Sequence, residues 1–275
     1  MDKETEDALA DAYNQGLALE KSGDLDGAER AYRRALALDP SDTGGVAIRL
    51  AAMGRGRSPD KMPDAYVATL FDQHADVFDD ILVDRLGYCV PLLLHDTIRR
   101  LGIGPFERLL DLGCGTGLTG TALADCTYHR TGVDLSERIL ELAFDRDIYD
   151  DLYLGEAVEF LRDFEEDDGT RPLWDLIAAT DVFPYLGTVG PFFEGAATRL
   201  APGGWLAFST ESLVADDGLE TSYRVGPKQR FAHAPCYVEA ALTAAGFKIR
   251  SNEEITVRHE DGVPVPGHLM IAQKC

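Results

Sequence analysis

Two hydrophobic periodicities divide this chain of 275 residues. Over residues 8–40 apolar positions recur at helical spacing, and the turn-forming sequence KSGDLDGA interrupts them once, so two helices are predicted. Beyond residue 106 the apolar runs become short, and turn residues and amphipathic stretches separate them. This second pattern is typical of strands that alternate with helices. It predicts a doubly wound α/β domain behind an all-α N-terminal module.

Five short apolar strands are expected in the second part of the chain. They lie at residues 109–112, 129–135, 152–154, 173–181 and 200–210. The last one follows a Pro-Gly-Gly turn, and the segment after it, residues 223–247, predicts a hairpin and then a helix. Ligands of such sheets bind at the carboxyl ends of the strands, so the residues at those ends deserve the closest inspection.

The segment LLDLGCGTG carries the strongest chemical signal. An apolar run ends there in Asp111 and opens onto Gly113, Gly115 and Gly117. Glycine has no Cβ, so the backbone amides of such a turn can face a ligand at the start of the next helix. A carboxylate at the strand end favours a positively charged ligand group over an anionic pyrophosphate.

Two further acids stand at the ends of the next two strands. Asp134 ends the strand-like run HRTGVDL, at a spacing where a carboxylate can accept both hydroxyls of a ribose. Glu156 follows the third strand in the same way. The strand-end acids and the glycines therefore predict a ligand site at one edge of the sheet.

With these residues the chain resembles the class I S-adenosylmethionine (SAM)-dependent methyltransferases over residues 107–275. The resemblance implies a seven-stranded Rossmann-like sheet whose last strands, near 248–257 and 266–273, form an antiparallel edge hairpin. It also implies SAM as the cofactor and S-adenosylhomocysteine as its product. The residues that it places at the cofactor in this domain are Asp111, Gly113, Cys114, Gly115, Asp134, Leu135, Glu156, Ala157, Thr180, Asp181 and Val182.

A nicotinamide dinucleotide site is a second interpretation of the glycines, because Gly115, Gly117 and Gly120 formally spell GxGxxG. In that register the first glycine lies four residues after Asp111, and Gly113 has no role. The sequence also shows no second dinucleotide-binding half. The SAM interpretation accounts for more of the motif.

Residues 65–102 connect the two modules and predict helices with one aromatic face. The residues that recur there at helical spacing are Tyr66, Leu70, Phe71, His74 and Phe78. In small-molecule class I methyltransferases a helix of similar pattern forms a lid over SAM. The resemblance implies that Tyr66, Phe71 and Phe78 cover the cofactor.

The N-terminal helix pair resembles one tetratricopeptide (TPR) repeat. Its small, aromatic and terminating positions are Gly16, Ala28, Tyr32, Ala35 and Pro40. One repeat cannot bury its own hydrophobic face, so we expect it to dock on the catalytic domain, on a second subunit in a homodimer, or on a protein partner. A short helix is expected to follow at residues 43–53. The combination resembles a bacterial group of predicted TPR-containing methyltransferases, which implies no particular substrate.

The methyl acceptor is expected beside the ends of the fourth and fifth strands. The candidate catalytic residues are His233, Tyr185 and His74, with His233 preferred as general base and His74 on the lid as the alternative. Arg224 and Arg230 supply positive charge nearby, which suits a carboxylate-bearing acceptor. The sequence TDVFPYLG departs from the Asn/Asp-Pro-Pro-Tyr signature of amino-group DNA methyltransferases, so methylation of bases loses support.

Composition argues against several partners. Asp and Glu number 48 against 26 Lys and Arg, a formal charge of −22, so nucleic acids and acidic membranes are repelled. Five scattered cysteines without a CxxC pair predict reduced thiols in the cytoplasm. No metal site is expected, because Cys126 and His129 lack a second pair. Neither a signal peptide nor a membrane-spanning stretch is expected.

We therefore divide the chain into a TPR-like module (residues 1–58), a lid with connecting helices (59–104) and a SAM-dependent methyltransferase domain (105–275). The predicted function is SAM-dependent methyl transfer by in-line displacement to a small-molecule or carrier-bound acceptor. Two alternatives remain open. One is a protein methyltransferase that docks its target on the TPR-like module, and the other is a non-catalytic SAM-binding interaction protein.

Overall fold

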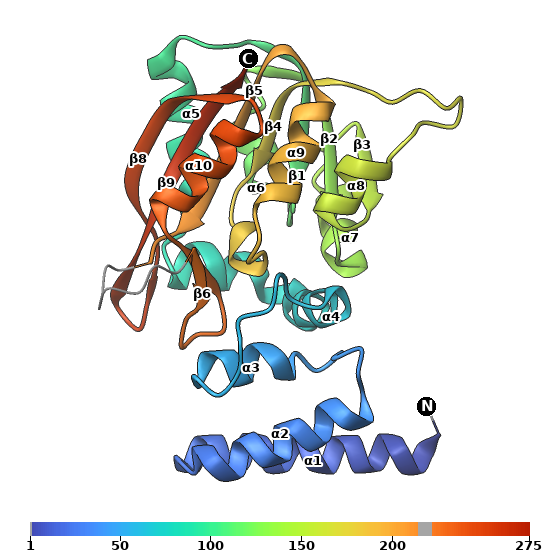
Figure 1. Cartoon of the computed structure of the whole chain (residues 1–275). Coiled ribbons are helices and arrows are strands. Elements are labelled where there is room, and N and C mark those ends of the chain that lie inside the picture. Colours follow the sequence, from blue (N-terminus) through green and yellow to red (C-terminus); the bar gives the residue numbers. More distant parts are fainter. Residues whose placement is uncertain (1, 214–221) are drawn as a thin grey trace.

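The computed structural model describes residues 2–213 and 222–275, and its centre is a seven-stranded sheet (Figure 1). From one edge to the other the strands are β3 (Asp151–Leu154), β2 (Thr127–Asp134), β1 (Phe106–Leu112), β4 (Trp174–Ala179), β5 (Leu200–Glu211), β9 (Val263–Lys274) and β8 (Phe247–Glu260). Neighbours from β3 to β5 pair in parallel, whereas β9 is antiparallel to both β5 and β8. The predicted fold class and its edge hairpin are confirmed.

Strand β1 lies where the strand order reverses, because it pairs with both β2 and β4. Doubly wound sheets bind ligands at the carboxyl ends of the strands beside such a reversal. The glycine segment that follows β1 therefore starts at the position where this architecture opens a crevice.

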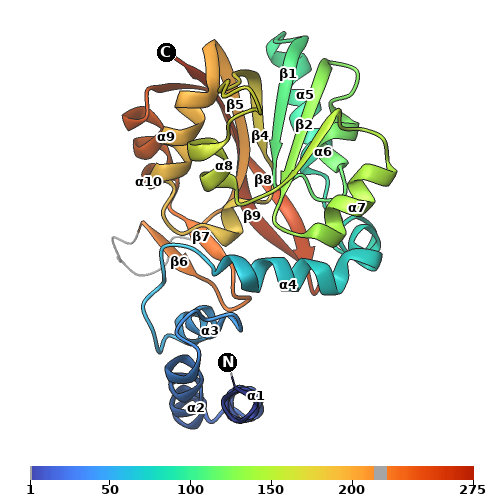
Figure 2. The same ribbon diagram turned by 90° about the vertical axis from the view of Figure 1, so that its right-hand side faces the viewer.

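Helices cover both faces of the sheet (Figure 2). On one face lie α5 (Val90–Leu101), α6 (Leu118–Ala122) and α7 (Glu137–Asp145), and on the other lie α8 (Ala157–Asp163), α9 (Gly190–Arg199) and α10 (Pro235–Ala244). Side chains alternate along a strand, so β1 serves both layers. Leu109 packs into the core under α5, whereas Leu110 and Leu112 pack into the core under α8 to α10.

The N-terminal module consists of α1 (Lys3–Ser22), α2 (Leu25–Leu38) and α3 (Val46–Ala52), as the sequence predicts. Asp2 and Asp24 cap the first two helices, since their carboxylates accept hydrogen bonds from Thr5 N at 2.8 Å and Gly27 N at 2.9 Å. A Cβ on Gly16 of α1 would lie 2.4 Å from the ring of Tyr32 on α2. Close packing of the two helices thus requires a glycine at this position.

Helix α3 connects the module to the rest of the chain. Val46 and Leu50 pack against α1 and α2, whereas Ile48 and Ala51 belong to a second apolar cluster. That cluster, which we call the junction core, also contains Met62, Val67, Val225 and Phe231. The helical module therefore packs against the lid and the hairpin of its own chain. The boundary that we placed at residue 58 cuts through the junction core.

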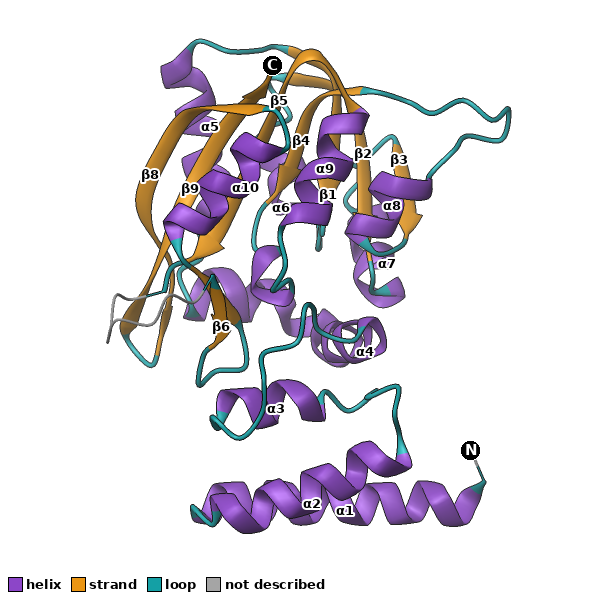
Figure 3. Cartoon of the chain, in the orientation of Figure 1, coloured by secondary structure: helices purple, strands orange, loops and turns teal. Residues whose placement is uncertain are grey.

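The remaining elements surround the carboxyl edge of the sheet. They are α4 (Asp64–His74), the short helices η1 (Ala75–Val77), η2 (Asp80–Arg85) and η3 (Phe183–Tyr185), and the strands β6 (Tyr223–Val225) and β7 (Phe231–His233). Strands β6 and β7 form the expected hairpin before α10, and Figure 3 shows β6 between the sheet and α3. No helix in the described part of the chain is long and apolar enough to cross a membrane.

Candidate functional site

A cavity of about 1020 Å³, partly open to solvent, lies at the carboxyl edge of the sheet. Twelve of the fourteen residues expected at the cofactor line it. They are Phe71, Phe78, Gly113, Cys114, Gly115, Asp134, Leu135, Glu156, Ala157, Thr180, Asp181 and Val182. Tyr185 also lines it, whereas Tyr66, Asp111, His74 and His233 do not. The sequence motifs thus converge on one space, and four of the proposed residues lie outside its surface.

The glycine turn after β1 has a backbone that other residues tolerate poorly. Gly113 and Gly115 adopt φ angles of +63° and +55°. A Cβ on Gly113 would lie 2.6 Å from Cγ2 of Val182, and one on Gly115 would lie 3.6 Å from the ring of Phe78. Glycine is therefore required both for the left-handed conformation and for the free space along this wall.

Asp134 organises the same turn from the end of β2. Its Oδ2 accepts a hydrogen bond from Gly115 N at 2.9 Å, and its Oδ1 accepts one from Ser136 N at 3.0 Å. Burial raises the pKa of this carboxyl group. Each carboxylate oxygen has a second lone pair, so Asp134 can still accept hydrogen bonds from ligand hydroxyls.

Glu156 combines a structural contact with a place on the cavity wall. It is the N-cap residue of α8, and its Oε2 accepts a hydrogen bond from Glu159 N at 2.8 Å. The ammonium group of Lys61, which also lines the cavity, lies 4.0 Å from that oxygen. The carboxylate is therefore fixed in place at the end of the cavity formed by β3.

Asp111 is buried beneath the glycine turn. Its Oδ2 accepts a hydrogen bond from the hydroxyl of Tyr149 at 2.6 Å, and its Oδ1 has no partner among the described residues. Burial raises the pKa of Asp111 to about 7. A buried carboxylate oxygen without a partner is costly, and a cation bound above the turn would reduce that cost.

A lid formed by α4, η1 and η2 covers the cavity. Phe71 lies edge-on to Phe78 at a centroid distance of 5.7 Å and to Tyr185 at 5.4 Å. Two acids of the lid are bonded to the domain below: Asp72 accepts a hydrogen bond from Ser136 Oγ at 2.5 Å, and Asp79 accepts one from Thr116 Oγ1 at 2.6 Å. The aromatic side chains are thereby held over the glycine turn.

Tyr66 and His74 do not belong to the aromatic wall. Successive residues of a helix are rotated by about 100°, so Tyr66 and Phe71 lie about 140° apart and cannot share a narrow face. The ring of Tyr66 instead packs against Gly45 at the start of α3. His74 is exposed, and its Nδ1 lies 2.8 Å from the carbonyl oxygen of Leu70. We therefore no longer propose either residue for the site.

His233 is also a structural residue in this fold. It is fully buried on β7, and its Nε2 lies 2.8 Å from the carbonyl oxygen of Leu186 and 3.2 Å from that of Gly187. Burial lowers the pKa of His233 to about 4, so the ring is neutral at pH 7 and donates from Nε2. Because the structure does not bring this imidazole to the cavity, we withdraw it as a general base.

Tyr185, the third catalytic candidate, does face the cavity. Burial raises the pKa of its hydroxyl to about 12. The phenol therefore stays protonated near neutral pH, where it can donate a hydrogen bond but is a poor base.

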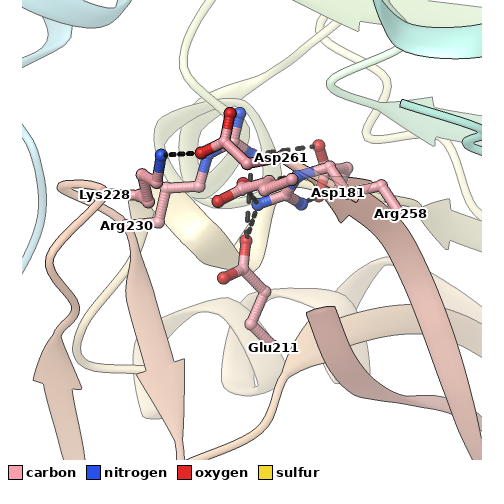
Figure 4. A network of polar contacts seen from close by, with 7 residues as sticks. Asp181, Glu211, Lys228, Arg230, Arg258 and Asp261 are labelled. Atoms are coloured by element: carbon pink, nitrogen blue, oxygen red, sulfur yellow. Dashed lines mark hydrogen bonds and ion pairs between the residues drawn. The ribbon is translucent and has the colours of Figure 1, made fainter. Parts of the chain in front are cut away.

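A cluster of buried charges was missed by the sequence analysis (Figure 4). Arg258 on β8 is fully buried, and its guanidinium lies 2.5 Å from Glu211, 2.8 Å from Glu260 and 3.3 Å from Asp181. Asp181 adopts a φ angle of +62°, a conformation that costs free energy in a non-glycine residue. Strand β8 alternates polar and apolar residues, so nothing in the sequence distinguishes Arg258 from a solvent-facing arginine.

Comparisons with known proteins agree with this architecture. Residues 110–206 match the family of methyltransferase domains, and residues 10–42 match the tetratricopeptide repeat. The ubiquinone biosynthesis O-methyltransferase of Hydrogenovibrio crunogenus is 26% identical over 163 residues, which are 54% of this chain and 65% of that protein. The corresponding protein of Bordetella avium is 30% identical over 154 residues, 52% of this chain and 62% of that protein. The chain thus spans less than two thirds of these relatives.

Solved structures of low sequence identity share the fold. The magnesium protoporphyrin IX methyltransferase of Synechocystis with bound SAM superposes with a TM-score of 0.57 at 15% identity, covering 80% of this chain and 99% of that one. The cyclase SpnF superposes with a TM-score of 0.59 at 16% identity, covering 76% and 95%. Since one neighbour is named a cyclase, the shared fold alone does not define a reaction. The chain thus has the fold of class I methyltransferases, with a match to a methyltransferase domain over residues 110–206 and to a TPR repeat over residues 10–42, as both resemblances in its sequence imply.

Proposed function

We propose that this protein transfers the methyl group of SAM to a small-molecule or carrier-bound acceptor. The observation that carries the proposal is the convergence of the glycine turn, Asp134 and Glu156 on one cavity under an aromatic lid. The methyltransferase-domain match and the named methyltransferases among its relatives support the same reaction.

The residues of the cavity fit SAM. A Cβ on Gly113 would collide with Val182 of the cavity wall, so the backbone stays bare there. Two residues earlier, Oδ1 of Asp111 is buried and has no hydrogen-bond partner among the described residues. We assign Asp134 to the ribose hydroxyls and Glu156 to the adenine. When bound, SAM supplies a sulfonium methyl group, which an acceptor atom takes while the bonding electron pair stays on sulfur.

The contribution of the protein to such a displacement is mainly orientation and exclusion of water. Phe71 and Phe78 cover the site, and Val182 and Tyr185 border it from the end of β4. Holding two reactants in line is worth up to about 7 to 11 kcal/mol. A general base is needed only for an acceptor that carries a proton.

The cytoplasm is the compartment that we propose. All five cysteines are free thiols, and Cys89, Cys114 and Cys126 are at least partly buried. Reducing compartments preserve such thiols.

Two measurements test the proposal. Calorimetry should show S-adenosylhomocysteine binding to the wild type, and incubation with methyl-labelled SAM and a cell extract should place label in the small-molecule or carrier fraction. An Asp134→Ala variant should lose both signals. Failure to bind SAM or its product would reject the cofactor, whereas label found only in other proteins would favour the alternative of a protein methyltransferase. Binding without any transfer would favour the non-catalytic alternative.

A further inference from the structure

Arg230 is a charged side chain of the cavity wall that forms long ion pairs, but donates no hydrogen bond to any residue in the described part of the chain. It follows the turn between β6 and β7, and it lines the cavity together with Asp181 and Tyr185. Its Nη1 is buried and makes no hydrogen bond with any residue in the described ranges. Buried guanidinium groups almost always donate hydrogen bonds, so a side chain that lines a cavity and donates none to the described residues is a candidate to bind a ligand there.

The neighbouring acids do not accept hydrogen bonds from Nη1 of Arg230. Nη1 of Arg230 lies 3.5 Å from Oδ2 of Asp181 and 3.8 Å from Oε1 of Glu211, both too long for hydrogen bonds. Arg258 takes the short contacts, at 2.5 Å from Glu211 and 3.3 Å from Asp181. As Figure 4 shows, the two arginines reach the same acids from β8 and from the hairpin. Arg258 holds the acids. Nη1 of Arg230 faces them from farther away, and its Nε and Nη2 donate no hydrogen bond to the described residues, so these two donors can serve a ligand in the cavity that Arg230 lines.

Arg230 lies away from most of the proposed cofactor residues. Its acid neighbours stand at the ends of β4 and β5, whereas Gly113, Asp134 and Glu156 follow β1, β2 and β3 on the other side of the strand reversal. Asp181, which is also expected at the cofactor, marks the border between the two halves. Adjacent strands are about 4.8 Å apart, so the end of β5 lies roughly 10 Å from that of β1. This half of the cavity is where an acceptor would approach.

The surroundings of Arg230 are aromatic. Its guanidinium carbon lies 5.8 Å from the ring centroid of Tyr185. The ring of Tyr185 packs against Phe71, and Phe71 packs against Phe78. An ammonium group would meet two guanidiniums here, because both carboxylate oxygens of Asp181 already face one. An apolar or aromatic molecule with an oxyanion would fit both the rings and the open donor.

We propose that Arg230 binds an anionic oxygen, most simply a carboxylate, of an otherwise apolar methyl acceptor. The inference rests on the proposed function and adds the chemical class of the acceptor. The cluster contains the carboxylates of Asp181, Glu211 and Glu260 and the guanidiniums of Arg230 and Arg258, so its formal charge is negative. Direct hydrogen bonds to the guanidinium therefore carry the recognition, rather than long-range attraction.

The test compares carboxylates with neutral amides of the same shape. Benzoate and octanoate, and benzamide and octanamide, are titrated against the full chain by ligand-observed NMR, with and without saturating S-adenosylhomocysteine. We expect at least one carboxylate to bind the wild type five- to tenfold more tightly than its amide. Arg230→Gln should abolish this preference, and Arg230→Lys should restore part of it. Arg224→Gln, an exposed position on the same hairpin, should leave it unchanged.

Two results would overturn the inference: no carboxylate preference in the wild type under either condition, or a preference that survives in Arg230→Gln. The affinity of Arg230→Gln for S-adenosylhomocysteine should stay within twofold of the wild type, since a large loss would assign the guanidinium to the carboxylate of the cofactor. If the wild type prefers carboxylates but does not bind S-adenosylhomocysteine, the proposed function fails and the anion site stands.

Discussion

The two halves of the cavity are built from different parts of the chain. At the ends of β1, β2 and β3 the wall consists of a glycine backbone and acids that each follow their own strand. At the ends of β4 and β5 it depends on Arg230 and Arg258, long side chains that arrive from a hairpin and from the edge of the sheet. The residues of the first half lie close together in the sequence, at strand ends and in the turn that follows. The residues of the second half come together only when distant segments of the chain pack.

This difference has a consequence for specificity. Backbone conformation at Gly113 and Gly115 leaves little room for substitution, so the first half suits a ligand that does not change. Charged side chains on a hairpin can be exchanged without altering the sheet. We therefore expect cofactor binding to depend on the first half and acceptor choice on the second, and four predictions test this division.

Gly113→Ala should have the largest effect. The new methyl group would lie 2.6 Å from Val182, and the residue would have to keep a φ angle of +63°. Overpacking and a left-handed conformation together cost the folded state about 2 to 4 kcal/mol. A turn that moves to relieve this strain no longer matches the ligand, so affinity for S-adenosylhomocysteine should fall by about 30-fold or more. Calorimetry on Gly190→Ala is the matched control, because a Cβ there meets no atom within 4 Å. A folded Gly113→Ala protein with unchanged affinity would remove the glycine turn from the site.

Asp134→Asn should follow in size. The carboxylate would lose charge-assisted hydrogen bonds worth about 1.5 to 3 kcal/mol, or roughly 10- to 100-fold in the same affinity. Asp175→Asn provides the control, since Asp175 also accepts a backbone hydrogen bond, from Arg108 N at 2.9 Å, but it does not line the cavity. Equal losses in the two variants would mean that the effect is one of folding and not of ligand contact.

The pH dependence of cofactor binding should reveal Asp111. With its pKa raised to about 7 by burial, this carboxyl group is largely protonated at pH 6. A positively charged ligand lowers that pKa, so binding releases a proton, and affinity rises as the pH increases toward 7 and levels off above it. A tenfold change would correspond to about one pKa unit. Calorimetry from pH 6 to 8 should show this rise in the wild type.

Two variants separate Asp111 from other titrating groups. Asp111→Asn should flatten the pH profile. Tyr149→Phe removes the hydrogen bond that favours the ionised carboxylate, and should shift the midpoint to higher pH. A profile that Asp111→Asn leaves intact would show that a different group titrates.

Two alanine variants on α3 should give the smallest effect on the site. Ile48→Ala and Leu50→Ala both create buried cavities, each costing about 2 to 5 kcal/mol of unfolding free energy. Only Ile48 belongs to the junction core with Phe231, the residue after Arg230. We expect Ile48→Ala to weaken carboxylate binding two- to fivefold and Leu50→Ala to leave it unchanged. Equal carboxylate affinities in the two variants would show that the helical module does not support the acceptor half of the cavity.

Much of the first half of the cavity could be predicted from the sequence because its chemistry is local. A strand end, a glycine turn and an acid two residues before the first glycine stay adjacent in any α/β fold, and parallel pairing brings Asp134 and Glu156 to the same edge. The seven-stranded sheet and its antiparallel edge hairpin were expected from the family resemblance and are confirmed.

The errors concern residues whose surroundings come from distant segments. His233 precedes α10, as expected, but its ring donates a hydrogen bond to the carbonyl groups of Leu186 and Gly187 inside the core. Tyr66 shares a helix with Phe71, but α3 lies on its side of that helix and Gly45 accommodates its ring. Neither partner is near in sequence, so periodicity could not identify these contacts.

The sequence by itself determined the alternation of strands and helices, the helical module at the N-terminus and the glycine turn with its acids, because these depend on residues close together in the chain. Only the tertiary structure decided that α3 shares a core with the lid and the hairpin, that Arg258 is buried among three carboxylates and that Arg230 faces the cavity. Burial and ion pairing depend on contacts between side chains from distant segments, and those contacts form only when the helices and strands pack.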